Sequence, residues 1–116
     1  MAISVLQIAY YTSLMQMRQT MLEHDGYVVT SALGNDQGMA VASSQHFDVA
    51  VVGFSSDHSP RTEMVRWLKQ HVPGLPVVAL LNHSLESFPE ADTTTFSEDP
   101  RTWLTAVRAT CVKNPG

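Results

Sequence analysis

The stretch SSDHSP (55–60) places three serines, an aspartate and a histidine close together, and these are the side-chain types of a hydrolase. In a serine hydrolase, however, the three catalytic groups usually come from distant parts of the chain and meet only in the fold. The stretch also lacks the glycine-flanked elbow that exposes a nucleophilic serine. We therefore interpret it as a turn that leads into a helix, and we expect no enzyme activity.

The histidines and the cysteine offer no metal site. Cys111 is the only cysteine, so no internal disulfide can form. The five histidines are scattered without the paired spacing that ligands of one ion require. A glycine-rich phosphate-binding motif is missing as well. We expect neither a metal nor a cofactor.

The charge balance argues against nucleic acid as a partner. Seven Lys and Arg stand against eleven Asp and Glu, a formal net charge of −4, and no basic cluster is available to displace the counterions of DNA or RNA. No stretch approaches the ~20 apolar residues of a membrane span, and the start MAISVLQIAYY lacks a basic signal region. We expect one cytoplasmic domain over residues 1–112, with a tail at 113–116.

Apolar runs alternate with helical patterns along the chain. The expected strands lie at 3–8, 27–31, 48–52, 77–81 and 93–96. Three helices have expected N-caps, namely Thr12 or Ser13, Ser59 and Asp99, and a further helix is expected to start at Asp36. In the first helix Met17 and Met21 are expected in the core. The segment 82–92 contains Pro89 and is too short for an ordinary crossover helix, so we expect a shortened or irregular helix there.

This alternation predicts an α/β fold with a parallel sheet covered by helices on both faces. Five strands fit the doubly wound order 2-1-3-4-5, in which ligands bind beyond the carboxyl ends of strands 1, 3 and 4. The run HFDVAVVG (46–53) is apolar throughout its strand, which is typical of a strand buried on both faces. It ends on Gly53, so the tip of the central strand offers no side chain.

Three segments resemble the receiver domain of bacterial response regulators. They are SVLQIAYYTSLMQMRQTMLEHDGYVVTSA (4–32), HFDVAVVG (46–53) and LKQHVPGLPVVALL (68–81). They are similar to the family's first three strands and its third helix and fourth strand, and no gap is needed from Val5 to Asn82. The resemblance implies a flavodoxin-like fold and a role in two-component signal transduction.

Receivers carry a nucleophilic aspartate after strand 3, two acidic Mg²⁺ ligands after strand 1, a Ser or Thr after strand 4 and a Lys after strand 5. Mg²⁺ needs hard oxygen ligands, and phosphoryl transfer needs the attacking carboxylate. The matching positions here are Ala9 and Tyr10, Gly53, Leu81, and either Phe96 or Ser97. The resemblance therefore implies a degenerate member, a pseudo-receiver that has lost its phosphorylation site.

Two other aspartates do not replace the missing nucleophile. Asp48 lies five residues before Gly53, about 16 Å away along an extended strand, and we interpret it as a strand-start residue. Asp57 follows Gly53 in a loop, where no carboxylate at Ala9 or Tyr10 would share a metal with it. We interpret Asp57 as a loop or turn residue.

Four aromatic residues are candidates for interactions. Tyr10 and Tyr11 lie at the mouth of the expected crevice, where a ring either fills the space left by the acids, with its hydroxyl in water, or anchors a ligand or partner. Trp67 lies beside the apolar stripe of its helix and is expected either at a partner contact or partly in the core. Trp103, in the last helix, is the other candidate.

These inferences give two functional hypotheses. The first is a receiver-like domain without phosphorylation chemistry that acts as a protein interaction or dimerisation module. The alternative is a small-molecule sensor that uses the vacated pocket around Ala9, Tyr10, Gly53 and Leu81.

Overall fold

The computed structural model describes residues 2–55, 57–82 and 86–113 as alternating strands and helices. The strands are β1 (Ser4–Ala9), β2 (Val28–Leu33), β3 (Val49–Val52), β4 (Val77–Leu81) and β5 (Thr93–Phe96). The helices are α1 (Thr12–His24), α2 (Gly34–Ser44), α3 (His58–His71) and α4 (Pro100–Lys113). The last part of the expected tail, residues 114–116, lies outside the described residues.

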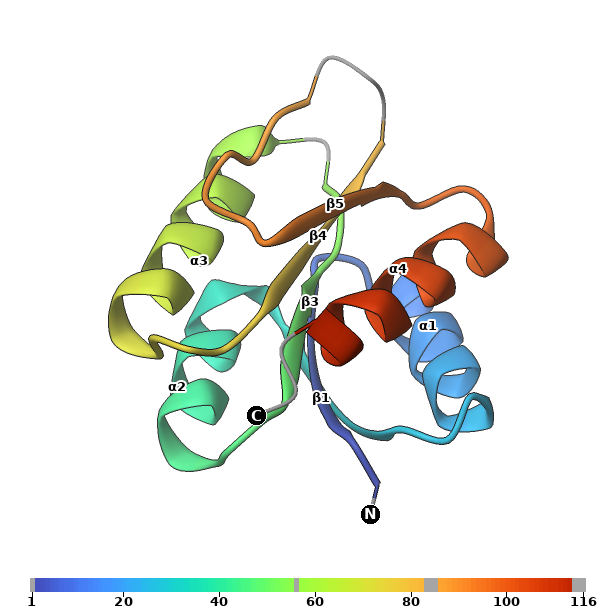
Figure 1. Ribbon diagram of the computed structural model, residues 1–116. Coiled ribbons are helices and arrows are strands. Elements are labelled where there is room, and N and C mark those ends of the chain that lie inside the picture. The colour runs from blue at the N-terminus through green and yellow to red at the C-terminus, as the bar shows by residue number, and fades with distance from the viewer. Residues whose placement is uncertain (1, 56, 83–85, 114–116) are drawn as a thin grey trace.

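All five strands are parallel, in the order β2-β1-β3-β4-β5. Helices α1 and α4 cover one face of the sheet, and α2 and α3 cover the other (Figure 1). The predicted flavodoxin-like α/β fold and strand order are confirmed. Within the described residues, no helix is both long enough and apolar enough to cross a bilayer.

Alternate residues of the strands build two cores. Leu6 and Ile8 of β1 face α2 and α3, whereas Val5 faces α1 and α4. β3 and β4 are buried along their whole length, as the unbroken apolar runs predict for strands covered on both faces. Each fully buried Leu or Val contributes roughly 1.5–3 kcal/mol, so the two layers of helices are held mainly by this burial.

The expectation that Trp103 contacts a partner is wrong. Its side chain is 1% exposed and packs with Val107 in the core between α4 and the sheet. The two residues are four positions apart, so the apolar stripe of α4 turns both toward the sheet. Trp67 is half-buried against the opposite core and stacks on His71 with ring centroids 4.5 Å apart.

Some helix starts differ from the expected ones. α1 begins at Thr12 with Tyr11 at the N-cap and no capping side chain, and α2 begins at Gly34, two residues before Asp36. The cap of α3 is Asp57, whose carboxylate accepts a hydrogen bond from the Ser59 N–H at 3.1 Å. Ser59 lies inside α3, two residues after the N-cap, so the sequence-based assignment of Ser59 as the cap was wrong.

The connection between β4 and β5 contains no helix among its described residues, 82 and 86–92. Residues 86–92 form a non-helical segment that turns at 89–90, where the Ala91 N–H donates to the Phe88 carbonyl. We call this segment the strap. The strap runs beside α3 (Figure 1). Residues 83–85 of the expected shortened helix lie outside the described part of the chain.

Candidate functional site at the carboxyl edge of the sheet

The strands β1, β3, β4 and β5 end together at one edge of the sheet. Ile8 pairs with Val52, so Ala9 and Gly53 leave their strands side by side, and the Gly53 N–H donates to the Ile8 carbonyl at 2.8 Å. Leu81 pairs with Phe96, and the Ser97 N–H donates to the Leu81 carbonyl at 2.9 Å. The predicted site positions are therefore neighbours in space. None of them supplies a carboxylate or an amine.

The space beside Gly53 is filled by Arg18, a residue that the sequence analysis missed. A Cβ atom at position 53 would lie 2.8 Å from Nη1 of Arg18 and 3.3 Å from the Ile8 carbonyl oxygen. The Arg18 side chain is only 2% exposed, and its Cζ lies 5.4 Å from the centre of the Phe54 ring, within range of a cation–π interaction. The absence of a side chain at Gly53 makes room for this guanidinium.

Helix α1 directs Arg18 inward because Arg18 occupies the buried stripe of the helix. Arg18 and Leu22, one turn apart, are its two buried residues. Met17, expected in the core, is 46% exposed instead. The signal in the sequence is the spacing of four between Leu14, Arg18 and Leu22, which places a cation within an apolar stripe.

Arg18 is a buried cation without an anionic partner among the described residues. Its Nε atom has no hydrogen-bond partner there, and no described carboxylate forms an ion pair with it. Burial lowers the pKa of the Arg18 guanidinium to about 10, because the charged form loses its hydration. The side chain is therefore still charged at neutral pH, and its charge is costly to leave uncompensated.

Arg61, the second buried arginine, is neutralised. Its side chain is 1% exposed, its Nη1 donates to the Leu80 carbonyl at 3.0 Å, and its Nη2 pairs with the carboxylate of Glu86. The Phe88 ring lies 4.9 Å from the Arg61 Cζ. His58 also approaches Glu86, with 3.6 Å between Nδ1 and Oε2. Within the described part of the chain, Arg61 thus has a counter-ion and Arg18 has none.

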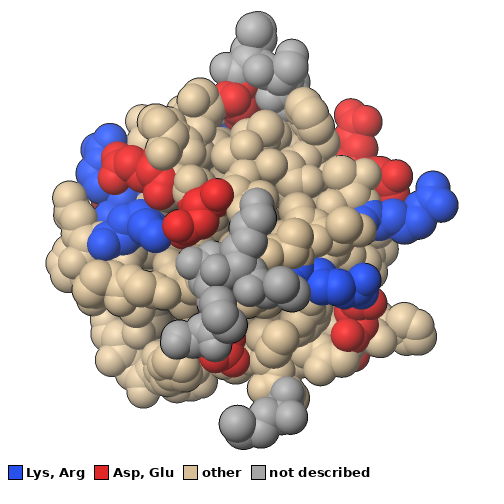
Figure 2. Space-filling view, viewed as in Figure 1, with Lys and Arg blue, Asp and Glu red and all other residues tan. Residues whose placement is uncertain are grey.

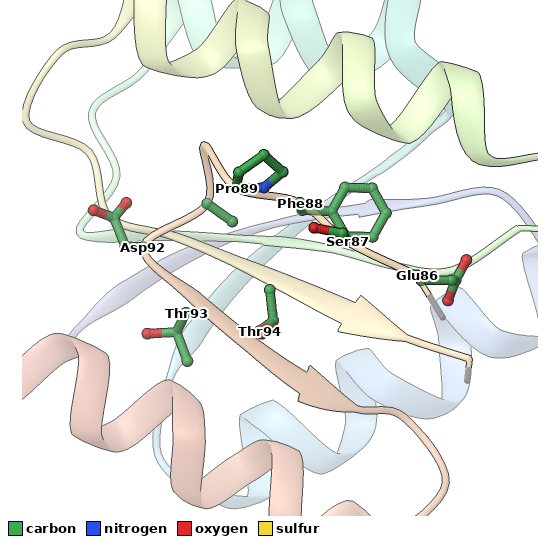
Figure 3. Close-up of a pocket in the computed structure, with 8 residues that line it drawn as sticks. Glu86, Ser87, Phe88, Pro89, Asp92, Thr93 and Thr94 are labelled. Atoms are coloured by element: carbon green, nitrogen blue, oxygen red, sulfur yellow. The ribbon is translucent and has the colours of Figure 1, made fainter. Parts of the chain in front are cut away.

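In the described residues, three pairs of an Arg or Lys with a carboxylate join the strap to α3. Besides Arg61 with Glu86, Arg66 pairs with Glu90 at 2.9 Å and Lys69 with Asp92 at 2.8 Å. Figure 2 shows acidic and basic side chains side by side over this part of the surface, at the upper left. The Phe88 ring turns toward α3 (Figure 3), where it stacks on His58 with centroids 4.5 Å apart.

The strap and β5 line a hollow of about 280 Å³. Its two ionisable side chains are already engaged, since Glu86 pairs with Arg61 and Asp92 pairs with Lys69 and accepts the Val77 N–H at 2.7 Å. The hollow therefore presents no free charge to a ligand. Figure 3 shows its lining.

Tyr10 and Tyr11 point to different surroundings. The Tyr10 hydroxyl donates to Oδ1 of Asn35 at 2.7 Å, so it is bonded to another side chain rather than reaching water as expected. Burial is the main reason that the pKa of the Tyr10 phenol is raised well above its usual value. Tyr11 is 39% exposed, and its ring centroid lies 6.0 Å from that of Phe54.

The two aspartates have structural partners. Asp48 accepts hydrogen bonds from the Ser4 N–H at 2.8 Å and the Ser4 hydroxyl at 3.1 Å, at the amino edge of the sheet, as a strand-start residue would. The backbone hydrogen bond from Ser4 is the largest cause of the lowered pKa of Asp48. Asp57 caps α3.

The residues of the SSDHSP stretch form no triad in the part of the chain that is described. The Ser55 hydroxyl donates to the Asp57 carbonyl, and the Asp57 carboxylate caps α3. The His58 ring lies against the strap, with Nε2 3.2 Å from the Ser87 carbonyl. Ser56 lies outside the described residues.

Solved structures resemble this fold, whereas the sequence comparisons find no match. No family model and no curated protein matches the sequence. A chemotaxis response regulator of Vibrio cholerae matches with a TM-score of 0.82 and 22% identity, over 95% of this chain and 99% of its own. A CheY-like receiver domain protein of Methanospirillum hungatei matches with a TM-score of 0.86 and 18% identity, over 99% and 98%.

The fold is that of a receiver domain. A response regulator of Thermotoga maritima with the same fold was solved in complex with Mg²⁺-BeF; it has a TM-score of 0.82 and 12% identity, over 94% of this chain and 98% of its own. At identities this low, the matches show that the fold is shared, and they show the fold alone.

A magnesium ion does not fit the residues of this receiver fold. Ala9 and Gly53 have no oxygen-bearing side chains, whereas Mg²⁺ prefers carboxylate ligands. The Arg18 guanidinium lies beside Gly53 and would repel a second cation in the same space.

Proposed function

We propose that the chain is a receiver-like signalling domain that has lost phosphoryl transfer and acts as a protein interaction or dimerisation module. The observation that carries this proposal is the contact between Arg18 and Gly53. Phosphoryl transfer to a receiver needs a carboxylate nucleophile at this position, and here a glycine faces a buried cation. The domain has therefore exchanged an acceptor of phosphate for a permanent positive charge.

The strap supports a role that does not depend on phosphorylation. A phosphorylation switch needs an element with two arrangements that the new charge can select between. Here the segment before β5 is tied to α3 by the buried Arg61–Glu86 pair and by the buried Phe88 ring. In this proposal the output depends on binding to a surface that is already formed.

Exposed apolar side chains mark the carboxyl edge as that surface. Among the described residues, Leu33 ends β2, Tyr11 follows β1 and Phe96 ends β5, and their side chains are 37%, 39% and 46% exposed. All three lie at the same edge because the strands are parallel. A partner protein or a second copy of the chain would bury them.

A phosphorylation assay tests the first part of the proposal. The protein is incubated with Mg²⁺ and a small phosphodonor, and its intact mass is measured. We expect no phosphoryl adduct, and Gly53→Asp serves as the variant that restores a carboxylate at the acceptor position. An adduct on Asp57 of the wild-type chain would contradict the proposal.

Light scattering tests the second part. If the carboxyl edge joins two copies, the mass rises with concentration, and replacing Tyr11 and Phe96 by Ser shifts the association to concentrations at least tenfold higher. Val28 is 57% exposed at the opposite edge, so Val28→Ser is the matched control. An equal effect of Val28→Ser would contradict the assignment of this edge.

The alternative function is a small-molecule sensor at the same edge. The space around Gly53 is not an empty apolar pocket, because Arg18 fills it. The charge of Arg18 is the observation that favours a sensor, and it restricts the ligand to an anion.

A further inference from the structure

We propose that the carboxyl edge binds a small oxyanion, without forming a covalent bond, through the guanidinium of Arg18. This inference gives the sensor alternative its class of ligand. It does not rest on the interaction role, which would stand if the anion did not bind.

Among the described residues at this edge, Arg18 is a cation without an anionic partner. Arg61 is paired with Glu86, and Asp57 is engaged as the cap of α3. Arg18 is 98% buried and has an unpartnered Nε, and no described carboxylate reaches it. A buried charge is normally paired in a folded protein, so the group that completes this site is an anion from outside the described chain.

The start of α1 adds to the positive potential at this edge. The helix has 13 residues, no capping side chain and no acidic residue in its first turn. Its first N–H groups therefore keep the partial positive charge of a helix N-terminus. α1 begins directly after β1, so this end of the helix lies at the same edge of the sheet as Gly53. Because Arg18 projects from the same helix, the two sources of positive potential are held together.

The chemistry of the guanidinium selects an oxyanion. Its planar N–H groups bind two oxygens of one carboxylate, phosphate or sulfate at once. The ligand must be small, because Nη1 already lies against Gly53 and Phe54 contacts the charged end. Phe54 lies in the loop after β3, so its ring can turn aside without breaking a strand.

Thermal unfolding tests the site with defined salts. The melting temperature is measured in tens of millimolar sodium phosphate, sodium sulfate or sodium acetate, each against sodium chloride of equal ionic strength. We expect at least one oxyanion to raise it by about 3 °C or more relative to chloride. A larger rise with phosphate and sulfate identifies tetrahedral anions as the ligand source, and a larger rise with acetate identifies carboxylates. Equal melting temperatures in all four salts would overturn the proposal.

Two variants connect the effect to Arg18. Arg18→Met keeps most of the apolar bulk and removes the charge, so the rise should vanish. Arg101→Met is the control, because that side chain is 93% exposed at the start of α4 and should keep the full rise. A rise in Arg18→Met equal to that of the wild type would show that the anion binds elsewhere and would overturn the proposal.

Gly53→Asp provides a test that keeps the arginine. The new carboxylate lies beside the guanidinium and takes the place of the external anion, so the rise should again be lost. A Gly53→Asp protein that responds to the same anion as strongly as the wild type would contradict the site. The interaction role is tested separately, by the mass of the protein in solution. Failure of the anion site can therefore be told apart from failure of the interaction role.

Discussion

Gly53 and Arg18 form a complementary pair, because the side chain missing from the strand leaves the room that the guanidinium occupies. A Cβ at position 53 would meet Nη1 of Arg18 at 2.8 Å. The contact is with the flexible end of a side chain, so a small residue at position 53 is accommodated by a shift of Arg18. The charge of the new side chain then decides whether the substitution is tolerated.

Gly53→Asp should be more stable than Gly53→Asn, which has nearly the same shape. Both require Arg18 to move, but only Asp supplies a charge partner to the buried guanidinium. We expect a difference of roughly 1–2 kcal/mol in the free energy of unfolding, measured in urea. If Gly53→Asp and Gly53→Asn were equally stable, Arg18 would already have a counter-ion in the wild-type protein.

Glu86→Gln should destabilise the protein strongly, because it leaves Arg61 buried without its anion. We expect a loss of about 3–5 kcal/mol in the free energy of unfolding. Glu90→Gln breaks the exposed pair with Arg66, and its effect should stay within about 1 kcal/mol. Adding Arg61→Met to Glu86→Gln should recover part of the loss. If both single Glu variants behaved alike, the strap would not be anchored by the buried pair.

Asp48 should contribute stability that depends on acid pH. Hydrogen bonds from Ser4 lower the pKa of Asp48 below its usual value of 3.8. The contribution is therefore fully present above that value and is lost as the pH falls through the lower pKa of the folded state. We expect Asp48→Asn to be less stable than the wild type at neutral pH, with a gap that closes in acid, as followed by urea midpoints. A gap that stayed constant with pH would contradict this; Glu63→Gln is an exposed control.

The Tyr10 phenol should make stability fall at alkaline pH. Its pKa is raised by burial above the usual 10.0, so above pH 10 the unfolded chain releases this proton before the folded chain does. Stability is thus complete below pH 10 and declines above it, and Tyr10→Phe should decline less steeply. Absorbance titration should show one late-ionising tyrosine fewer in that variant. Tyr27→Phe is the comparison, since burial also raises the pKa of Tyr27.

The sheet could be predicted because its signals are local. The runs VAVV and VVALL (49–52, 77–81) are apolar throughout, and only strands covered on both faces can bury such runs completely. Because these strands are parallel, their carboxyl ends, at Ala9, Gly53 and Leu81, were correctly predicted to lie at one edge of the sheet. Trp103 was misassigned because an aromatic residue on a helix is equally compatible with a core and with an interface until the packing of that helix is known.

Arg18 could not be found in the same way. It lies 35 positions before Gly53, and nothing local indicates that a glycine in one strand makes space for a side chain from α1. The ion pairs of the strap are a second example. The acidic residues Glu86, Glu90 and Asp92 read as solvated charges, and only the path of the strap brings them to the basic residues of α3.

The strap also bears on how the chain folds. Its ion pairs join residues 25, 24 and 23 positions apart, whereas the Arg108–Asp25 pair between α4 and the end of α1 spans 83 positions. Closing a short loop costs less chain entropy than closing a long one. The segment from α3 through β4 to the strap is therefore a unit of local contacts, which can assemble before the two ends of the chain meet.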